Sequence, residues 1–218
     1  MNSDDVPAGP VLQIGVCSAY ATCACSVAFT AASVLTETGT LGPPWNLLLP
    51  IVPSLLLAPA FLVMMVCVNA ITPASRRIWS QIGVALTIVY VPLVSAAYIV
   101  ELFVVEPRML RGFGAETSLL TLTRSDSVLN AIDGLGYLMM CFATLASANA
   151  FGRVRRQRLL GWLFRANGFL ALPIFLTYFV NRAFIWAAAP WAVTVAVSAF
   201  LLGGEFRAQI AARRSGSH

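Results

Sequence analysis

Six long runs of apolar residues, separated by short polar segments, limit most strongly how this chain can fold. They cover residues 11–35, 47–71, 78–103, 127–151, 159–180 and 184–202. A bilayer core about 30 Å thick is crossed by roughly 20 apolar residues in a helix, and in lipid every backbone N–H and C=O needs a partner within the chain. The sequence therefore predicts an all-α fold: a polytopic transmembrane bundle of six helices, forming a single domain over residues 1–218.

The composition is not that of an ordinary soluble domain. Only 11% of the residues are charged, whereas about 25% is usual in soluble proteins, and the mean hydropathy is +0.81. A chain of 218 residues cannot hide so much apolar surface in one core. A bilayer is therefore expected to cover much of it.

The basic residues, all of them arginines, indicate how the helices are oriented. Six helices place the following nine on one side: Arg76, Arg77, Arg153, Arg155, Arg156, Arg158, Arg207, Arg213 and Arg214. The other side has Arg108, Arg111, Arg124 and Arg182. Because cytoplasmic loops are enriched in basic residues, both termini are predicted to be cytoplasmic, in a multi-pass protein of a bacterial inner (plasma) membrane.

The arginine-rich segment from Gly152 to Arg158 has two interpretations. Arg153, Arg155, Arg156 and Arg158 could hold anionic lipid head groups, or they could serve only as orientation signals. The expected partners are membrane lipids and a small-molecule ligand of unknown identity, with a homo-oligomer as an open alternative. No nucleic acid is expected despite the net charge of +5, because the arginines are explained by topology.

Residue types that common catalytic sites need are missing from this chain. The single histidine is His218, and all five cysteines lie inside apolar runs. Catalysis by histidine and histidine metal sites are therefore not expected, and no P-loop, GxSxG, HExxH, CxxC or Gly-rich dinucleotide motif occurs. We expect no metal, no cofactor and no catalytic residue; a lipid-modifying enzyme would have only Glu101 and Asp133 as acid–base groups.

A stripe of polar side chains follows the fourth apolar run. Its members, three or four residues apart, fall within an arc of roughly 80° on a helix: Asn130, Asp133, Tyr137, Cys141 and Thr144. Such a stripe avoids lipid and faces other helices or water.

A second polar face near the end of the third run completes a candidate pocket. Helices that run in opposite directions bring Tyr98 and Glu101 to the same depth as the start of the stripe, so we predict an outward-facing polar pocket made of Tyr98, Glu101, Asn130, Asp133, Tyr137 and Arg182. An acidic group in a low dielectric must pair, become neutral or meet water. Either acid could pair with Arg182 or, unpaired, carry a proton or bind a cation. Alternatively, Glu101 is simply solvated at the end of its run, and Asp133, nearly two turns into the next run, is solvated as well.

Three segments in the middle of the chain carry a resemblance: VELFVVEPRMLRG, LNAIDGLGYLMM and RRQRLLGWLF. Between Tyr98 and Phe164 they are similar to a group of uncharacterised multi-pass bacterial membrane proteins. In that group an apolar helix ends in a Val-Val-x-Pro step, and a helix with an acidic-Gly/Leu-Gly-Tyr motif follows. The resemblance implies that Asp133, Gly136 and Tyr137 belong to a patterned segment, and it brings no assigned activity.

Two functions from different classes agree with these features. One is an integral inner-membrane protein whose outward-facing pocket binds or passes a small solute, ion or proton. The other is a membrane scaffold or accessory subunit whose polar helix faces mediate helix packing or partner association. Water that reaches Asp133 from outside would favour the first function, and a dry interface with Asp133 bonded to a neighbouring helix would favour the second.

Overall fold

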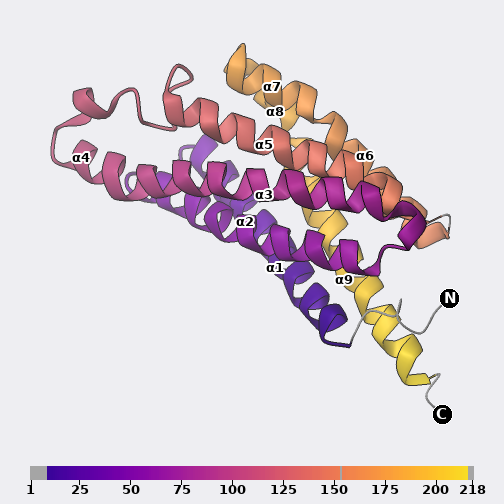
Figure 1. The fold of residues 1–218 in the computed structure, drawn as a ribbon. Coiled ribbons are helices and arrows are strands. Elements are labelled where there is room, and N and C mark those ends of the chain that lie inside the picture. The colour runs from indigo at the N-terminus through magenta and orange to yellow at the C-terminus, as the bar shows by residue number, and fades with distance from the viewer. Residues whose placement is uncertain (1–8, 153, 216–218) are drawn as a thin grey trace.

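The part of the chain that the structure describes is built from helices. The computed structural model describes residues 9–152 and 154–215 (Figure 1). Six helical spans are long and apolar enough to cross a membrane: Gly9–Glu37, Trp45–Ile71, Ala74–Leu110, Val128–Ala150, Arg155–Phe179 and Arg182–Ser215. An all-helical fold with six candidate membrane spans is thus confirmed.

Three of the spans are single long helices and three are interrupted. The single helices are α1 (Gly9–Glu37), α2 (Trp45–Ile71) and α5 (Val128–Ser147). The interrupted spans join α3 (Arg77–Val100) to α4 (Glu106–Leu110), α6 (Arg155–Phe169) to α7 (Ala171–Phe179), and α8 (Ile185–Ala188) to α9 (Pro190–Ser215). The last two breaks fall next to Pro173 and Pro190, whose missing N–H removes a helical hydrogen bond.

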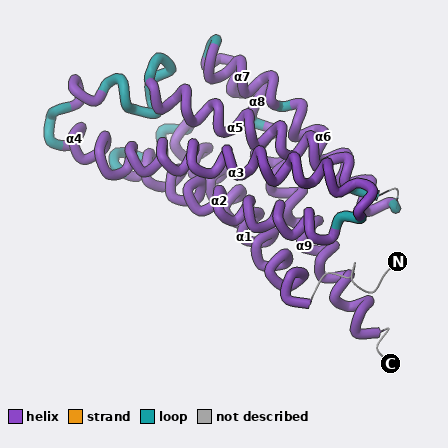
Figure 2. Tube along the Cα trace, in the orientation of Figure 1, coloured by secondary structure: helices purple, strands orange, loops and turns teal. Residues whose placement is uncertain are grey.

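The spans form a closed ring in which sequence neighbours pack side by side. α1 packs against α2, α2 against α3, α3 against α5, and α5 against both α6 and α7. α6 packs against α9 and α9 against α1, so the first span and the last span close the ring. α1 begins and α9 ends at one end of the bundle, while α4 and the long connection to α5 lie at the other end (Figures 1 and 2).

The two ends of the bundle differ in charge. We call the end where α1 begins the arginine-rich end; its described arginines are Arg76, Arg77, Arg155, Arg156, Arg158, Arg207, Arg213 and Arg214. The opposite end, which we call the loop end, has Arg108, Arg111, Arg124 and Arg182 among the acidic residues Glu37, Glu106, Glu116 and Asp126. Arg153 lies outside the described residues. Which end faces the cytoplasm stays a prediction.

Large apolar side chains cover the outside of the ring, as contact with lipid would require. Phe103 is 73% exposed and Phe169 is 70% exposed. Four tryptophans, Trp45, Trp79, Trp162 and Trp186, are also exposed; tryptophan is enriched where membrane helices meet the interface. The fifth, Trp191, is buried.

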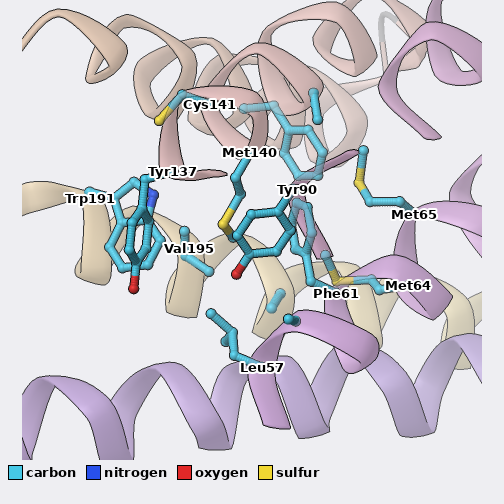
Figure 3. Packing of buried hydrophobic residues seen from close by; sticks show 14 of the residues in the cluster. Leu57, Phe61, Met64, Met65, Tyr90, Tyr137, Met140, Cys141, Trp191 and Val195 are labelled. Atoms are coloured by element: carbon cyan, nitrogen blue, oxygen red, sulfur yellow. The ribbon is translucent and has the colours of Figure 1, made fainter. Parts of the chain in front are cut away.

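Aromatic and sulfur-containing side chains fill the inside of the ring. Figure 3 shows them converging from four helices: Leu57, Phe61, Met64 and Met65 of α2, Tyr90 of α3, Tyr137, Met140 and Cys141 of α5, and Trp191 and Val195 of α9. Phe61 meets Tyr90 edge to face, with ring centroids 6.0 Å apart. The interior is therefore a packed core along the axis of the ring.

The third span is longer than the sequence predicts, because it continues past Phe103 to Leu110. Residues Glu101–Val105 form a turn of π-helix, in which the Glu106 N–H donates to the Glu101 carbonyl. In a regular α-helix Pro107 would clash with the carbonyl four residues before it. The wider turn in front of the proline lets the helix pass through it, and such π turns are frequent at functional sites.

Glycines allow α1 and α9 to approach closely where the ring closes. A Cβ atom at Gly203 would lie 3.0–3.2 Å from the Tyr20 ring, and one at Gly15 would lie 2.9–3.0 Å from the Phe206 ring. A Cβ atom at Gly204, the next residue, would have nothing within 4 Å. Two adjacent glycines on α9 thus differ in whether they face α1.

Replacing Gly203 with leucine should push α1 away from α9, whereas Gly204→Leu should not. Both changes raise helix propensity, so the pair isolates the steric clash. We expect Gly203→Leu to lower the free energy of unfolding by about 1–3 kcal/mol relative to Gly204→Leu, seen as a lower Tm in detergent. Equal midpoints for the two variants would show that this contact does not hold the ring closed.

Candidate functional site

Asp133 is a buried acidic side chain in the interior of the ring. It lies on α5 and is 5% exposed. Its Oδ2 atom accepts a 2.8 Å hydrogen bond from the Tyr178 hydroxyl on α7. The neighbouring glycine provides the space for this contact, because a Cβ atom at Gly134 would lie 2.6 Å from Tyr178 Cγ. Asp133 thus supplies the acceptor, and Gly134 leaves the space that the Tyr178 donor occupies.

Three further aromatic residues, Tyr98, Tyr137 and Trp191, pack beside the Asp133–Tyr178 pair. The hydroxyls of Tyr98 on α3 and Tyr137 on α5 are 2.7 Å apart and share a hydrogen bond. The Tyr137 ring stacks on Tyr178 with centroids 6.0 Å apart, and it meets Trp191 of α9 edge to face at 4.8 Å (Figure 3). These five residues, Asp133, Tyr98, Tyr137, Tyr178 and Trp191, are called the Asp133 cluster.

Two buried polar atoms of the Asp133 cluster have no hydrogen-bonding partner among the described residues. They are Asp133 Oδ1 and Trp191 Nε1. Leaving a buried polar group without a partner costs about 1–3 kcal/mol, and more for a charged group. Asp133 therefore has one oxygen fixed by Tyr178 and a second, buried oxygen that makes no hydrogen bond within the described residues.

Glu101 does not join the Asp133 cluster directly. It is fully buried at 0% exposure, so it is not solvated at the end of the helix. Its two carboxylate oxygens accept hydrogen bonds from Thr121 Oγ1 at 3.0 Å and from the Leu122 backbone N–H at 2.9 Å. Glu101 therefore binds the connection between α4 and α5 onto the end of α3.

Arg182 holds the same connection from the other side. Its guanidinium donates to the Thr123 carbonyl at 3.4 Å and pairs with Glu37, at the end of α1, at 3.5 Å. The predicted pairing of Arg182 with Glu101 or Asp133 is replaced by these contacts. The Thr121 and Thr123 hydroxyls are 2.9 Å apart, so one short segment links Glu101 to Arg182.

Asn130 also contacts the region above the Asp133 cluster. Its side-chain amide donates to the Ser125 carbonyl at 3.3 Å and to the Tyr178 carbonyl at 3.5 Å. The six residues of the predicted pocket thus divide into two groups. Tyr98, Asp133 and Tyr137 lie in the Asp133 cluster, while Glu101, Asn130 and Arg182 hold residues 121–125, which we call the cap.

The predicted pocket did not include Tyr178 and Trp191. The signal that the sequence offers for Trp191 is its position, since it follows Pro190 in the interior of an apolar run. Tyr178 carries no comparable signal, because its hydroxyl reaches Asp133 only through the space that Gly134 leaves.

The described residues offer no metal centre, and the groove of the structure lies away from the Asp133 cluster. They contain no group of three or more His, Cys, Asp or Glu side chains that could hold a metal ion. A groove of about 510 Å³ opens between α1 and α2, but it is apolar and contains no residue of the Asp133 cluster.

At the arginine-rich end, the described arginines of the fourth connection begin α6. Arg155, Arg156 and Arg158 are exposed there, while Arg153 lies outside the described residues. Binding of anionic lipid head groups by this segment stays a prediction.

In comparisons with known proteins, no family model, no curated protein and no solved structure matches this chain. The resemblance of residues 98–164 to multi-pass bacterial membrane proteins therefore stays a prediction.

Alanine at Gly134 should displace Tyr178 from Asp133. A Cβ atom at Gly136, two residues away on α5, would meet α3 only at an ordinary distance of 3.5 Å or more, which makes Gly136→Ala a matched control. Both variants gain the same helix propensity, so overpacking should make Gly134→Ala less stable than the control by about 1–3 kcal/mol. Thermal unfolding in detergent measures this difference; a Gly134→Ala midpoint at or above that of Gly136→Ala would contradict the proposed packing.

Glutamine at Glu101 should loosen the cap. The variant loses one of two acceptor oxygens and the charge, and a hydrogen bond to a charged group is worth about 1.5–3 kcal/mol. We expect hydrogen exchange at the Leu122 amide to accelerate by about tenfold or more. Glu116→Gln is the control: Glu116 is exposed, and its ion pair with Arg108 is long, at 4.0 Å. This variant removes the same charge without touching the cap. Unchanged exchange at Leu122 in the Glu101 variant would rule out this role.

Proposed function

We propose that this protein is a multi-pass membrane protein in which Asp133 binds a small positive charge, either a proton or an inorganic monovalent cation. The observation that carries this proposal is Asp133 Oδ1, a buried carboxylate oxygen with no partner among the described residues. We further propose that the loop end faces outward, as the charge difference between the two ends favours.

The argument for a positive charge comes from the cost of burying an unpaired carboxylate. An ionised group in a low dielectric must pair, take up a proton or bind an ion. The sequence predicts Arg182 as a pairing partner, but its contacts are with Glu37 and the Thr123 carbonyl. The tyrosine hydroxyls of the cluster can donate hydrogen bonds to the carboxylate, yet they bring no formal charge.

The cap supports access from the loop end. It lies over the end of the ring that contains the Asp133 cluster, and it is held by few side chains, chiefly Glu101, Asn130 and Arg182. The Arg182 side chain is 59% exposed, so its contacts compete with water. Breaking them would open the shortest route between the loop end and Asp133.

The second candidate function is a membrane scaffold or accessory subunit. It is favoured by the fact that Glu101, Asn130 and Arg182 are all engaged in contacts within the chain, and that Asp133 is bonded to a neighbouring helix. In a scaffold these polar groups would only hold helices together.

Infrared spectroscopy of the protein in nanodiscs distinguishes the two functions. Asp133→Asn keeps the side-chain size and an acceptor for Tyr178, so the variant should fold. Asp126→Asn is the control: the Asp126 side chain is 61% exposed, and hydrogen bonds of 2.6 and 2.9 Å from Arg124 keep the pKa of that carboxyl below its ordinary value. Asp126 therefore stays ionised at neutral pH.

We expect the wild type at neutral pH without added salt to show a protonated-carboxyl band that Asp133→Asn abolishes and Asp126→Asn retains. If a cation is the ligand, adding Na⁺, K⁺ or Li⁺ will remove the band by displacing the proton. Asp133 that is ionised in the absence of these cations, with no change when they are added, would contradict the proposal and favour the scaffold.

A further inference from the structure

A small cavity lies inside the ring, away from the Asp133 cluster. It has a volume of about 10 Å³ and is enclosed by α2, α5, α6 and α9; its lining residues are Phe61, Met64, Thr144, Phe164, Asn167, Val195 and Ser198. Thr144 follows Asp133 by three turns of α5, roughly 16 Å along the helix axis. The cavity is thus a separate feature, nearer to the arginine-rich end.

A pair of hydrogen-bonded polar side chains forms one wall of this cavity. Asn167 of α6 donates to Thr144 Oγ1 at 3.0 Å, and its Oδ1 accepts from Thr194 Oγ1 of α9 at 2.9 Å. Asn167 is 1% exposed and Thr144 is 3% exposed. The amide of Asn167 has a second N–H and a second lone pair on oxygen, so this wall can still donate and accept.

Ser198 of α9 contributes an unpartnered hydroxyl to the lining of the same cavity. Its side chain is 5% exposed, and its Oγ has no hydrogen-bonding partner among the described residues. Buried hydroxyls in helices usually bond back to a carbonyl of their own helix, as Thr87 does to Gly83 and Thr144 does to Cys141. Ser198 makes no such bond, although an unmade bond costs about 1–3 kcal/mol.

The size and charge of the cavity define what can occupy it. A single water molecule needs about 10–15 Å³ and two to four polar partners, and this cavity offers about 10 Å³. No ionisable side chain lines it, so a cation there would have no counter-charge and would be strongly disfavoured. The ligand must therefore be neutral, no larger than water, and able to donate and accept hydrogen bonds.

We infer that this cavity binds one internal water molecule, which bridges Ser198 Oγ to the Thr144–Asn167 pair. The water joins α9 to α5 and α6 at the last turn of α6, just before the chain breaks at Leu170. It satisfies the Ser198 hydroxyl and adds a further polar contact to the hydrogen bonds that Asn167 of α6 makes with Thr144 of α5 and Thr194 of α9. This inference does not depend on the ligand of Asp133.

Radiolytic labelling tests for the water, because X-ray pulses generate hydroxyl radicals from internal water next to the side chains that contact it. Met64 lines the cavity, whereas Met140 is equally shielded in the core but does not line it. In the wild-type protein, in detergent and with ¹⁸O-labelled water, we expect Met64 to be oxidised at least threefold more than Met140. Equal oxidation of the two methionines would overturn the inference.

Removing the bridging hydroxyl provides the second arm of the experiment. Ser198→Ala should reduce oxidation of Met64 severalfold, because the water loses one of its partners. The control is Ser18→Ala: Ser18 is also buried, but its hydroxyl donates to the Gly15 carbonyl of its own helix at 3.2 Å. Unchanged Met64 labelling in folded Ser198→Ala would overturn the role of Ser198, and if that variant fails to fold, the wild-type comparison still decides.

Discussion

Hydrocarbon offers no hydrogen-bonding partner for a polar group, and the arrangement of polar side chains in this bundle agrees with that constraint. A chain with six helices apolar enough to cross a membrane has to satisfy its polar side chains inside the ring or at its ends. Polar side chains find their partners in three layers along the axis of the ring. The cap binds Glu101 and Arg182, the Asp133 cluster joins a carboxyl to tyrosines, and the Thr144–Asn167 pair connects α5, α6 and α9.

Small residues decide which polar groups can meet. Gly134 allows the Tyr178 ring to lie against α5, and without that approach Asp133 would lose its only hydrogen bond to α7. The same principle closes the ring, where Gly203 accepts the Tyr20 ring. Tight packing and polar contact are therefore coupled in this protein, because a shift of one helix by the width of a methyl group alters both.

The sequence predicts part of the site because helical periodicity determines which residues share a face. The spacing of Asp133, Tyr137 and Cys141 identifies a buried face of α5, and the Arg distribution identifies two unlike ends. Periodicity within one helix does not reveal which residues face it from other helices. Tyr178 and Trp191 come from distant parts of the chain, and their positions depend on how the ring closes and on space left by glycine.

The partners of Glu101 and Arg182 were beyond prediction for a different reason. Glu101 begins a π turn that α-helical spacing does not anticipate, and its donors belong to an irregular segment whose path no periodicity describes. Arg182 pairs with Glu37 because ring closure brings the end of α1 close to the turn before α8. The packing of distant helices thus pairs Arg182 with Glu37, whereas the sequence predicts Arg182 in the pocket.

The contact between α1 and α9 also has a consequence for biogenesis. During translation α1 leaves the ribosome before α9, so the side of α1 that packs against α9 has no such partner until α9 has been made. The Ser26 hydroxyl, which donates to the Ala192 carbonyl at 3.0 Å, has no such acceptor in the meantime. The native ring can therefore close only after α9 has been made, and shortened chains that stop before α9 would leave one side of α1 exposed to cellular quality control.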